Sequence, residues 1–211
     1  MTTPEHTMVG IHSAFALGLH RRYGWQSVAM AGIASNVPDW DGIAMFVDMA
    51  RFESIHRVWG HNFVSILLTS ILLAVTQFRW DWLGRIGRLF ADRFSIPKQD
   101  SPYSLTAARS NFGFLLFFGI AFAAQTVHLP CDMVVSGGSG LNDWSVEPWW
   151  PFSDVGYVYP MIPWGDPGPT LILMSGAVIA AKWPHRTIII SRSTIGALLV
   201  YLLVRRFVTP V

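Results

Sequence analysis

Residues 112–131 read FGFLLFFGIAFAAQTVHLPC, and Asp132 follows directly. The stretch holds no charged side chain unless His128 is protonated, and its length matches the roughly 20 apolar residues that a membrane-spanning helix needs. An ordinary soluble domain has no place for an uninterrupted apolar run of this length. The stretch therefore predicts a transmembrane helix that ends on ionisable residues.

Two more stretches are long and apolar enough to cross a bilayer, namely 62–78 (NFVSILLTSILLAVTQF) and 187–204. Three others, 8–19, 25–37 and 168–181, are shorter, so we expect them to be tilted, partly embedded or shielded by neighbouring helices. The first two of these are rich in Gly and Ala, which lets membrane helices pack closely. The pattern predicts an all-α fold, a polytopic membrane bundle of about five to six helices.

The composition of the whole chain agrees with a membrane destination. Hydrophobic residues make up 52% and charged residues 13% of the 211 residues, and the mean hydropathy is +0.39. That charged share is about half of what a soluble domain carries. The length predicts a single domain over residues 1–211. A net charge of +2 without a long basic block argues against nucleic acid as a partner.

The N-terminal residues and the single cysteine exclude two common arrangements. Glu5 and His6 stand where a signal peptide has a basic region, so we expect insertion to rely on the helices themselves. Cys131 alone cannot form an intramolecular disulfide or a Cys-rich zinc motif. Any metal site must therefore use histidines and carboxylates.

Basic residues predict how the helices are oriented. The segment 79–110 carries six Lys and Arg residues. Arg21 and Arg22 separate the first two apolar segments, and Lys182 and Arg186 separate the last two. By the positive-inside tendency, these three connections lie in the cytoplasm of a multi-pass protein of the cell membrane.

The opposite, non-cytoplasmic face then receives the N-terminus, residues 38–61 and residues 128–167. Nearly all the histidines and aspartates that are considered below as metal ligands lie in these three places. The orientation was predicted from Lys and Arg alone, so the two observations are independent. Arg205 and Arg206 are the exception, because this topology also leaves them outside. We therefore expect the active site on the non-cytoplasmic face.

Residues 133–167 form a segment rich in Trp and Pro that cannot continue a helix. It begins near SGGSG, and tryptophan favours the boundary between membrane and water. We interpret the segment as an ordered interfacial loop that covers the helix ends.

The strongest local motif is His128-Leu-Pro-Cys-Asp132. Residues four apart share one helix face, and ionisable groups at membrane depth are usually functional or paired. Pro130 lies between them and can end the helix there. The motif predicts either two metal ligands or a His–Asp hydrogen bond that locks a helix end.

The motif Pro38-Asp39-Trp40-Asp41 places two carboxylates just after the second apolar segment. In an extended turn, alternate residues can both reach one cation. Asp is also common in turns after Pro for purely structural reasons, so the motif alone is weak evidence.

The third motif is His56-Arg57-Val58-Trp59-Gly60-His61-Asn62. Either Gly60 allows a bend that brings the two histidines together, or Asn62 caps the next helix and leaves His61 at its mouth. Imidazole is the commonest side-chain ligand for transition metals. Arg57 suits a phosphate or carboxylate on a substrate. Two surface histidines in a polar loop would be the structural alternative.

The remaining histidines are weaker candidates. His6 precedes the first apolar segment, whereas His12 and His20 lie within it or just past it. Each is, taken alone, more often a structural or surface residue than a ligand. His185 lies in a basic turn on the opposite face and is excluded.

Together, these histidines and aspartates predict a site for a divalent metal at the end of the helix bundle. The mixture fits zinc, with manganese or iron as alternatives, in a hydrolytic role. More than four candidate ligands indicate a site for about one to three ions, since a two-metal site both activates water and holds a leaving oxygen.

At these motifs the chain resembles the YdjM-like membrane proteins, which are identified as inner-membrane metal-dependent hydrolases. The family pattern has a His before the first helix, then Leu-Pro-Asp-x-Asp, His-Arg-Gly-x-Thr-His-Ser, His-x-x-x-Asp and Leu-Trp-Pro-Phe. Order and spacing agree over residues 5–153. Val58, Gly60 and Asn62 depart from the pattern, which affects loop geometry more than the ligand-type residues.

A more remote likeness is to the zinc-dependent phospholipase C and P1 nuclease group. The order His6, Asp41, His56 or His61, His128, Asp132 is similar to the order of metal ligands in that group. This likeness implies hydrolysis of a phosphodiester or phosphomonoester.

We therefore predict a membrane-bound metal-dependent hydrolase that acts on a phosphoester or phospholipid-like amphiphile, with membrane lipid as its surroundings. A metal transporter or a metal-stabilised structural membrane protein is the alternative, and the sequence indicates no oligomeric state. Asp39 or Asp41 is expected as general base and Arg57 as the group that neutralises developing anionic charge. The predicted metal ligands are His6, Asp39, Asp41, His56, His61, His128 and Asp132.

Overall fold

The computed structural model describes residues 1–93, 110–137 and 144–208 of the 211. These residues form helices, and their one β-type pairing is an isolated bridge between Val146 and Tyr157. Part of the basic segment 79–110 and Asp143 lie outside the described residues. The helices are α1 (Thr3–Ala16), α2 (Leu19–Tyr23), α3 (Trp25–Ala34), η1 (Val37–Phe46), α4 (Met49–Ile55), α5 (Phe63–Trp80), α6 (Trp82–Arg93), α8 (Asn111–Met133), α9 (Pro167–Lys182), η2 (Pro184–Arg186) and α10 (Thr187–Val208).

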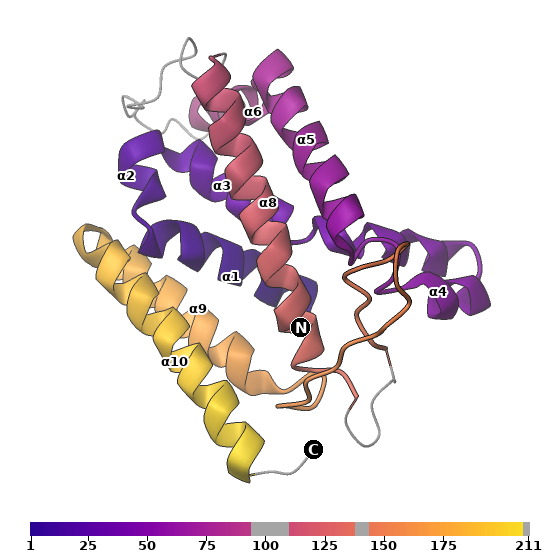
Figure 1. The fold of residues 1–211 in the computed structure, drawn as a ribbon. Coiled ribbons are helices and arrows are strands. Elements are labelled where there is room, and N and C mark those ends of the chain that lie inside the picture. Colours follow the sequence, from indigo (N-terminus) through magenta and orange to yellow (C-terminus); the bar gives the residue numbers. More distant parts are fainter. Residues whose placement is uncertain (94–109, 138–143, 209–211) are drawn as a thin grey trace.

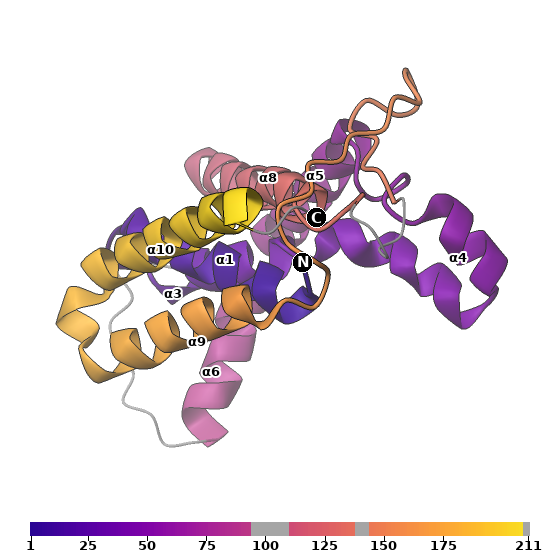
Figure 2. The same ribbon diagram turned by 90° about the horizontal axis from the view of Figure 1, so that it is seen from below.

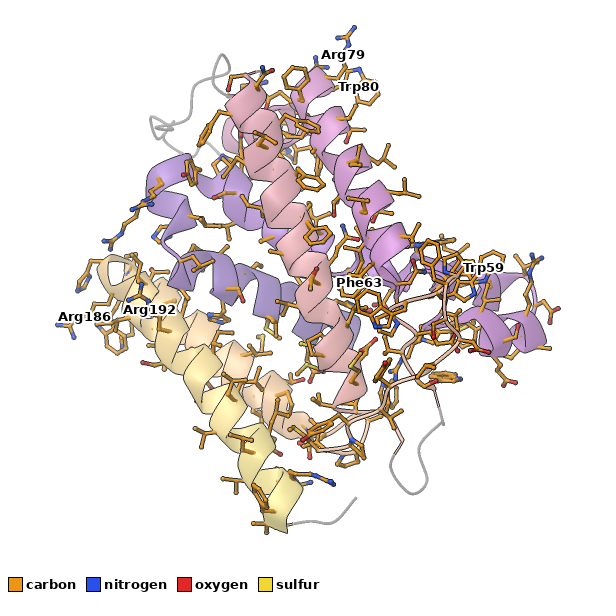
Figure 3. All side chains as sticks on the ribbon, in the orientation of Figure 1. Trp59, Phe63, Arg79, Trp80, Arg186 and Arg192 are labelled. Atoms are coloured by element: carbon orange, nitrogen blue, oxygen red, sulfur yellow. The ribbon has the colours of Figure 1, made fainter. Side chains whose placement is uncertain are left out.

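Three of the described helical stretches are long and apolar enough to cross a membrane, namely Phe63–Trp80, Asn111–Met133 and Pro184–Val208. They correspond to the three segments for which the sequence predicts a span. The all-α membrane fold is therefore confirmed. In Figure 3, Arg79 and Trp80 lie at one end of α5, while Phe63 and Trp59 lie at the other.

Helices α5 and α8 lie side by side and run in opposite directions (Figure 1). A small polar network joins them near their middles. Gln125 donates to the Ser70 hydroxyl over 2.9 Å and accepts from the Thr69 hydroxyl over 2.7 Å. Because these groups satisfy one another, they hold the two spans together without exposing a polar atom to lipid.

The short apolar segments do not cross a bilayer by themselves. Helix α1 has 14 residues and α3 has 10, which gives lengths of about 21 and 15 Å against a hydrocarbon core of about 30 Å. They pack against each other between α8 and the α9–α10 pair (Figure 1). Met30 and Ala34 of α3 are completely buried. Of the three arrangements that the sequence left open, shielding by neighbouring helices describes this pair.

Helices α9 and α10 form a hairpin whose open end is fastened by Asp166. The Tyr201 hydroxyl donates to Asp166 over 2.6 Å, and Arg205 pairs with it at 2.9 Å. This ion pair gives a structural reason for Arg205, which the predicted topology places on the side opposite to most Lys and Arg residues. Close to the middle of the hairpin, Gly176 of α9 faces Thr194 of α10.

The connections meet at two ends of the bundle. Arg21 of α2 donates to the backbone carbonyl of His185 in η2 over 3.0 Å, so α2 and η2 lie together. At the other end, the N-terminus lies against the end of α8, close to the loop formed by residues 144–166 (Figure 2). The described part of this loop contains no helix and exposes Trp149, Phe152 and Trp164. This agrees with the predicted loop over the helix ends.

We expect Gly176→Leu to destabilise the protein. A Cβ at Gly176 would lie 2.1 Å from the Thr194 hydroxyl oxygen, and overpacking of this kind costs about 1–3 kcal/mol. Thermal unfolding of the purified protein in detergent measures the change. Gly196→Leu is the matched control, because a Cβ at Gly196 meets no atom within 4 Å. Equal unfolding temperatures for the two variants would contradict this account of the hairpin.

Candidate metal centre

The carboxylate of Asp132, near the end of α8, is the group on which the site converges. Its Oδ1 lies 2.6 Å from the backbone amine of Met1 and 3.0 Å from His6 Nε2. Its Oδ2 lies 3.1 Å from His61 Nε2 and 3.2 Å from His128 Nε2. The carboxylate is 2% exposed, so its charge is balanced by these neighbours rather than by water.

Helix α8 continues to Met133 with Pro130 inside it. The sequence left open whether Pro130 ends the helix, and the structure shows that it does not. His128 and Asp132 therefore do share one face, as residues four apart should.

Four side chains converge on one point: Asp39, His61, His128 and Asp132. Each offers one ligand atom, and these atoms all lie within 4.8 Å of one another. His61, His128 and Asp132 are buried, whereas the Asp39 side chain is 27% exposed. Solvent therefore reaches the cluster at Asp39 and not at the other three residues.

The hydrogen bonds of the two central histidines indicate which ring nitrogen carries the proton. His128 Nδ1 lies 2.6 Å from the backbone carbonyl of Ser35, which can only accept. His61 Nδ1 lies 3.2 Å from a carboxylate oxygen of Asp41. Both rings therefore donate from Nδ1, and in the neutral form each directs an Nε2 lone pair toward the centre. Partners of this kind orient metal-binding histidines in general.

The spacing of the ligand atoms of Asp39, His61 and His128 fits a metal ion. His61 Nε2 and His128 Nε2 are 3.0 Å apart, and each lies 3.5 Å from Asp39 Oδ1. Four ligands around zinc at about 2.0–2.1 Å are separated by roughly 3.3 Å when the geometry is tetrahedral. Two facing lone pairs beside two carboxylates repel one another unless a cation or a proton lies between them. The residues present can therefore hold a divalent metal.

The electrostatics of the centre favour positive charge. Burial lowers the pKa of His61, but hydrogen bonds to Asp132, Asp39 and Asp41 outweigh it and raise that pKa well above its usual value. A field that stabilises a proton on His61 also stabilises a bound cation.

Asp41 lies behind His61 rather than in the cluster of four. One of its oxygens lies 3.0 Å from His56 Nδ1, and the other accepts from the backbone N–H groups of Arg57 and Gly60. Burial raises the pKa of Asp41, but the hydrogen bonds from His56 and His61 outweigh it and lower that pKa to about 2. Asp41 is therefore an ionised carboxylate that orients His61.

The two carboxylates do not meet in one extended turn, as the sequence led us to expect. Asp39 and Asp41 belong to the 3₁₀ helix η1. With about three residues per turn, positions two apart are separated by roughly 240°. Only Asp39 can then face the four-residue cluster while Asp41 faces the loop that holds His56.

The loop between α4 and α5 is shaped by a close approach to η1. Asn62 accepts from the Ser65 backbone N–H and caps α5, so His61 does lie at the mouth of that helix. A Cβ at Gly60 would lie 1.8 Å from the carbonyl oxygen of Pro38. Gly60 therefore permits contact with η1 rather than a bend between the two histidines.

His56 and His6 lie beside the cluster of four. The His56 ring packs against Phe52 and Trp144, at centroid distances of 4.6 and 4.9 Å. The His6 ring, which belongs to α1 rather than preceding it, stacks on His128 at 3.7 Å. His6 forms a hydrogen bond with the second oxygen of Asp132, whereas His56 forms one with Asp41 and packs edge-on against the His61 ring at 5.7 Å.

Arg57 is buried behind the centre in a left-handed backbone conformation, with φ +66°. Its guanidinium donates to the Ser136 hydroxyl and, over 3.3 Å, to the carbonyl of Trp144. Its Nε lies 3.6 Å from Asp132 and makes no hydrogen bond. Arg57 therefore interacts electrostatically with Asp132 rather than with the other three residues of the cluster.

The sequence did not point to Ser35, Ser136 or the amine of Met1. The Ser35 carbonyl and the Met1 amine are backbone groups, which leave no mark on residue type. Ser136 lies four residues after Asp132 and donates to its carbonyl, a spacing that could have drawn attention to it.

Comparison with known proteins gives one match. The sequence model of the YdjM inner membrane protein family covers residues 1–209. No curated protein and no solved structure matches the chain. Together with the three apolar helices, the family match supports a multi-pass protein of the inner membrane. Because the match extends over nearly the whole chain, the chain belongs to the YdjM inner membrane protein family.

Proposed function

We propose that this protein is a membrane-bound metal-dependent hydrolase that cleaves a phosphoester of a phospholipid-like amphiphile. The observation that carries the proposal is the convergence of Asp39, His61, His128 and Asp132 within 4.8 Å at the end of membrane helices. Both imidazoles are already oriented by hydrogen bonds on their outer nitrogens. A lipid headgroup lies at this level of a bilayer.

Zinc is the ion we propose, because the imidazoles of His61 and His128 and the carboxylate of Asp132 form a three-residue donor set of the kind that catalytic zinc sites use. Manganese and iron take the same donors. The second oxygen of Asp132 is paired with the Met1 amine and with His6. A divalent ion held at the metal centre would polarise a phosphoryl or carbonyl oxygen and make a water molecule more acidic.

The residues of the chain then have distinct roles. Asp39 is the exposed carboxylate of the cluster, so we assign it as the general base that takes a proton from the attacking water. His61, His128 and Asp132 then remain as three metal ligands, which leaves a fourth position for water. Asp41 keeps His61 in the tautomer that directs Nε2 inward. Arg57 offsets negative charge through Asp132, because it is buried and faces that carboxylate.

A metal-stabilised structural role is the second candidate. Asp132 of α8 joins the N-terminal segment through Met1 and His6 and the start of α5 through His61, so a metal could serve to fasten these three parts of the chain. The exposed edge at Asp39 favours catalysis, since structural zinc sites are closed whereas catalytic sites keep an open position. Transport is less well supported, because Thr69, Ser70 and Gln125 at the middle of the spans bind one another.

We propose that the site faces the non-cytoplasmic side of the membrane. The support is the distribution of Lys and Arg, which are concentrated in the connections at the opposite end of the bundle.

The first test is the metal content. We expect the protein purified in detergent to retain zinc in stoichiometric amount, measured by elemental mass spectrometry, and His61→Ala/His128→Ala to lose it. His185→Ala is the control, because His185 is exposed in a turn far from the site. Full retention of metal by a correctly folded double variant would rule out the centre described above.

The second test concerns Asp41. We expect Asp41→Asn to weaken zinc binding by about 10–100-fold, as loss of an outer partner of a ligating histidine typically does. Competition with a chromophoric chelator measures the affinity. Asp154→Asn, which changes an exposed carboxylate, should leave the affinity unchanged. Identical affinities for the two variants would show that Asp41 does not orient His61.

The third test is turnover. We expect protein in lipid vesicles to release phosphate from a long-chain phosphatidate, to lose this activity with a chelator and to regain it with zinc. Asp39→Asn should lower the rate by about 10²–10⁴-fold, the usual contribution of a general base. If zinc-loaded wild type cleaves this ester no faster than His61→Ala/His128→Ala, the metal has a structural role instead.

A further inference from the structure

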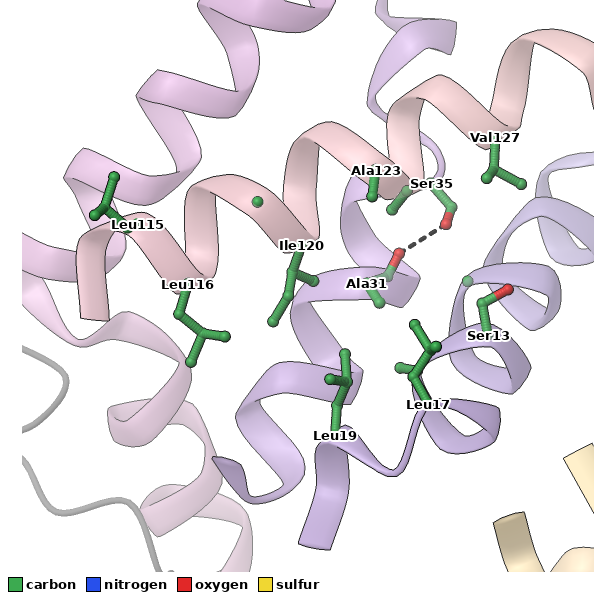
Figure 4. A pocket seen from close by; sticks show the side chains of 14 residues that line it. Ser13, Leu17, Leu19, Ala31, Ser35, Leu115, Leu116, Ile120, Ala123 and Val127 are labelled. Atoms are coloured by element: carbon green, nitrogen blue, oxygen red, sulfur yellow. Dashed lines mark hydrogen bonds between the residues drawn. The ribbon is translucent and has the colours of Figure 1, made fainter. Parts of the chain in front are cut away.

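An apolar cavity of about 390 Å³ lies between α1, α3 and α8, and none of the four residues of the metal centre lines it. Figure 4 shows α8 along one side of it and the short helices along the other. No residue that lines it carries a charge. The larger apolar side chains around it are Leu17, Leu19, Leu115, Leu116, Ile120 and Val127.

The cavity opens sideways toward the bilayer. Leu17 is 71% exposed and Leu115 is 62% exposed, and these two residues lie on the facing helical segments that border it. The inner side is built from small residues, among them Gly10, Ala14 and Ala31, which leave room between the helices. In a membrane, such an opening faces hydrocarbon chains rather than water.

The dimensions favour one hydrocarbon chain over a helix. From Leu115 to Val127, α8 rises about 18 Å, compared with about 15 Å for half of a bilayer core. An acyl chain is much thinner than a helix, which is about 10 Å wide, and a volume of about 390 Å³ spread over this length suits the thinner occupant. The cavity therefore has the length of one lipid leaflet and favours a single chain as its occupant.

The cavity ends beside the metal centre. Ser35 lines it, and the backbone carbonyl of the same residue lies 2.6 Å from His128 Nδ1. Val127 immediately precedes His128, and Gly10 lies one turn after His6 on α1. A lipid whose chain lies in the cavity with its polar end toward Ser35 would have that end at the level of the histidines.

We propose that this cavity binds one acyl chain of a membrane lipid and so places the headgroup ester at the metal centre. The assignment of that lipid as the substrate rests on the proposed hydrolase function, whereas binding of the chain does not. The lipid enters from the bilayer side between α1 and α8.

Gly119 offers a direct test of chain binding. It lines the cavity, and a Cβ added there meets no atom within 4 Å, so Gly119→Leu fills the cavity without a clash. Gly196→Leu makes the same change at another open position on a spanning helix, outside the cavity. Both variants should therefore fold.

The probe is a phosphatidate with a photoreactive group in the middle of one acyl chain, present in phosphatidylcholine vesicles with the reconstituted full chain. After irradiation, we expect peptides from residues 10–19 and 115–127 to carry most of the label. Gly119→Leu should reduce that labelling by roughly tenfold, the loss expected when about two methylene groups are no longer buried. Gly196→Leu should not change it.

Labelling spread evenly over the lipid-facing sides of α5 and α10, and insensitive to Gly119→Leu, would overturn the proposal. Turnover separates this result from failure of the hydrolase function. With an active enzyme, Gly119→Leu should slow cleavage of long-chain phosphatidate but not of a water-soluble phosphate ester. Labelling of the cavity without any turnover would support binding of the acyl chain and would contradict only the proposed hydrolase function.

Discussion

The carboxylate of Asp132 must be compensated, because a buried charge without partners is strongly destabilising. Its partners come from positions as far as 131 residues away, and each fixes one part of the chain at the end of α8. Met1 and His6 bring the start of α1, while His61 brings the mouth of α5. The arrangement of the N-terminal half of the bundle follows from this one requirement.

The same requirement accounts for the two short helices. Helix α1 has to begin at Asp132 and still pack against α9 and α10, so it crosses the bundle between the spanning helices (Figure 1). Its return through α3 ends at Ser35, whose carbonyl orients His128. Helices that stay inside the bundle need not span a bilayer. This pair therefore serves to deliver His6 and Ser35 to the site, and the space left beside its small residues is the apolar cavity.

The sequence predicted the spans, the His128–Asp132 pair and the end of the bundle at which the ligands gather. Helical periodicity and apolar length determine these features, and both can be read from residue types. The division between Asp39 and Asp41 could not be predicted, because it depends on whether the backbone after Pro38 is extended or 3₁₀-helical. His56 and His61 have the same side chain, and only the cap at Asn62 directs His61 into the centre. Backbone groups such as the Ser35 carbonyl give no sequence signal at all.

The site lies at the end of α8, where an apolar helix meets the loop of residues 144–166, and it combines burial with one accessible side. His61, His128 and Asp132 lie where water is excluded, so an ion among them would interact strongly with its ligands and with an anionic ester. Asp39 is the member of the cluster that reaches solvent, as the proposed general base would need to do in order to pass on a proton. An acyl chain beside α8 would approach from the apolar direction, and water from the direction of Asp39. A phosphoester at the boundary between the two would meet both, which neither a fully buried nor a fully exposed site would allow.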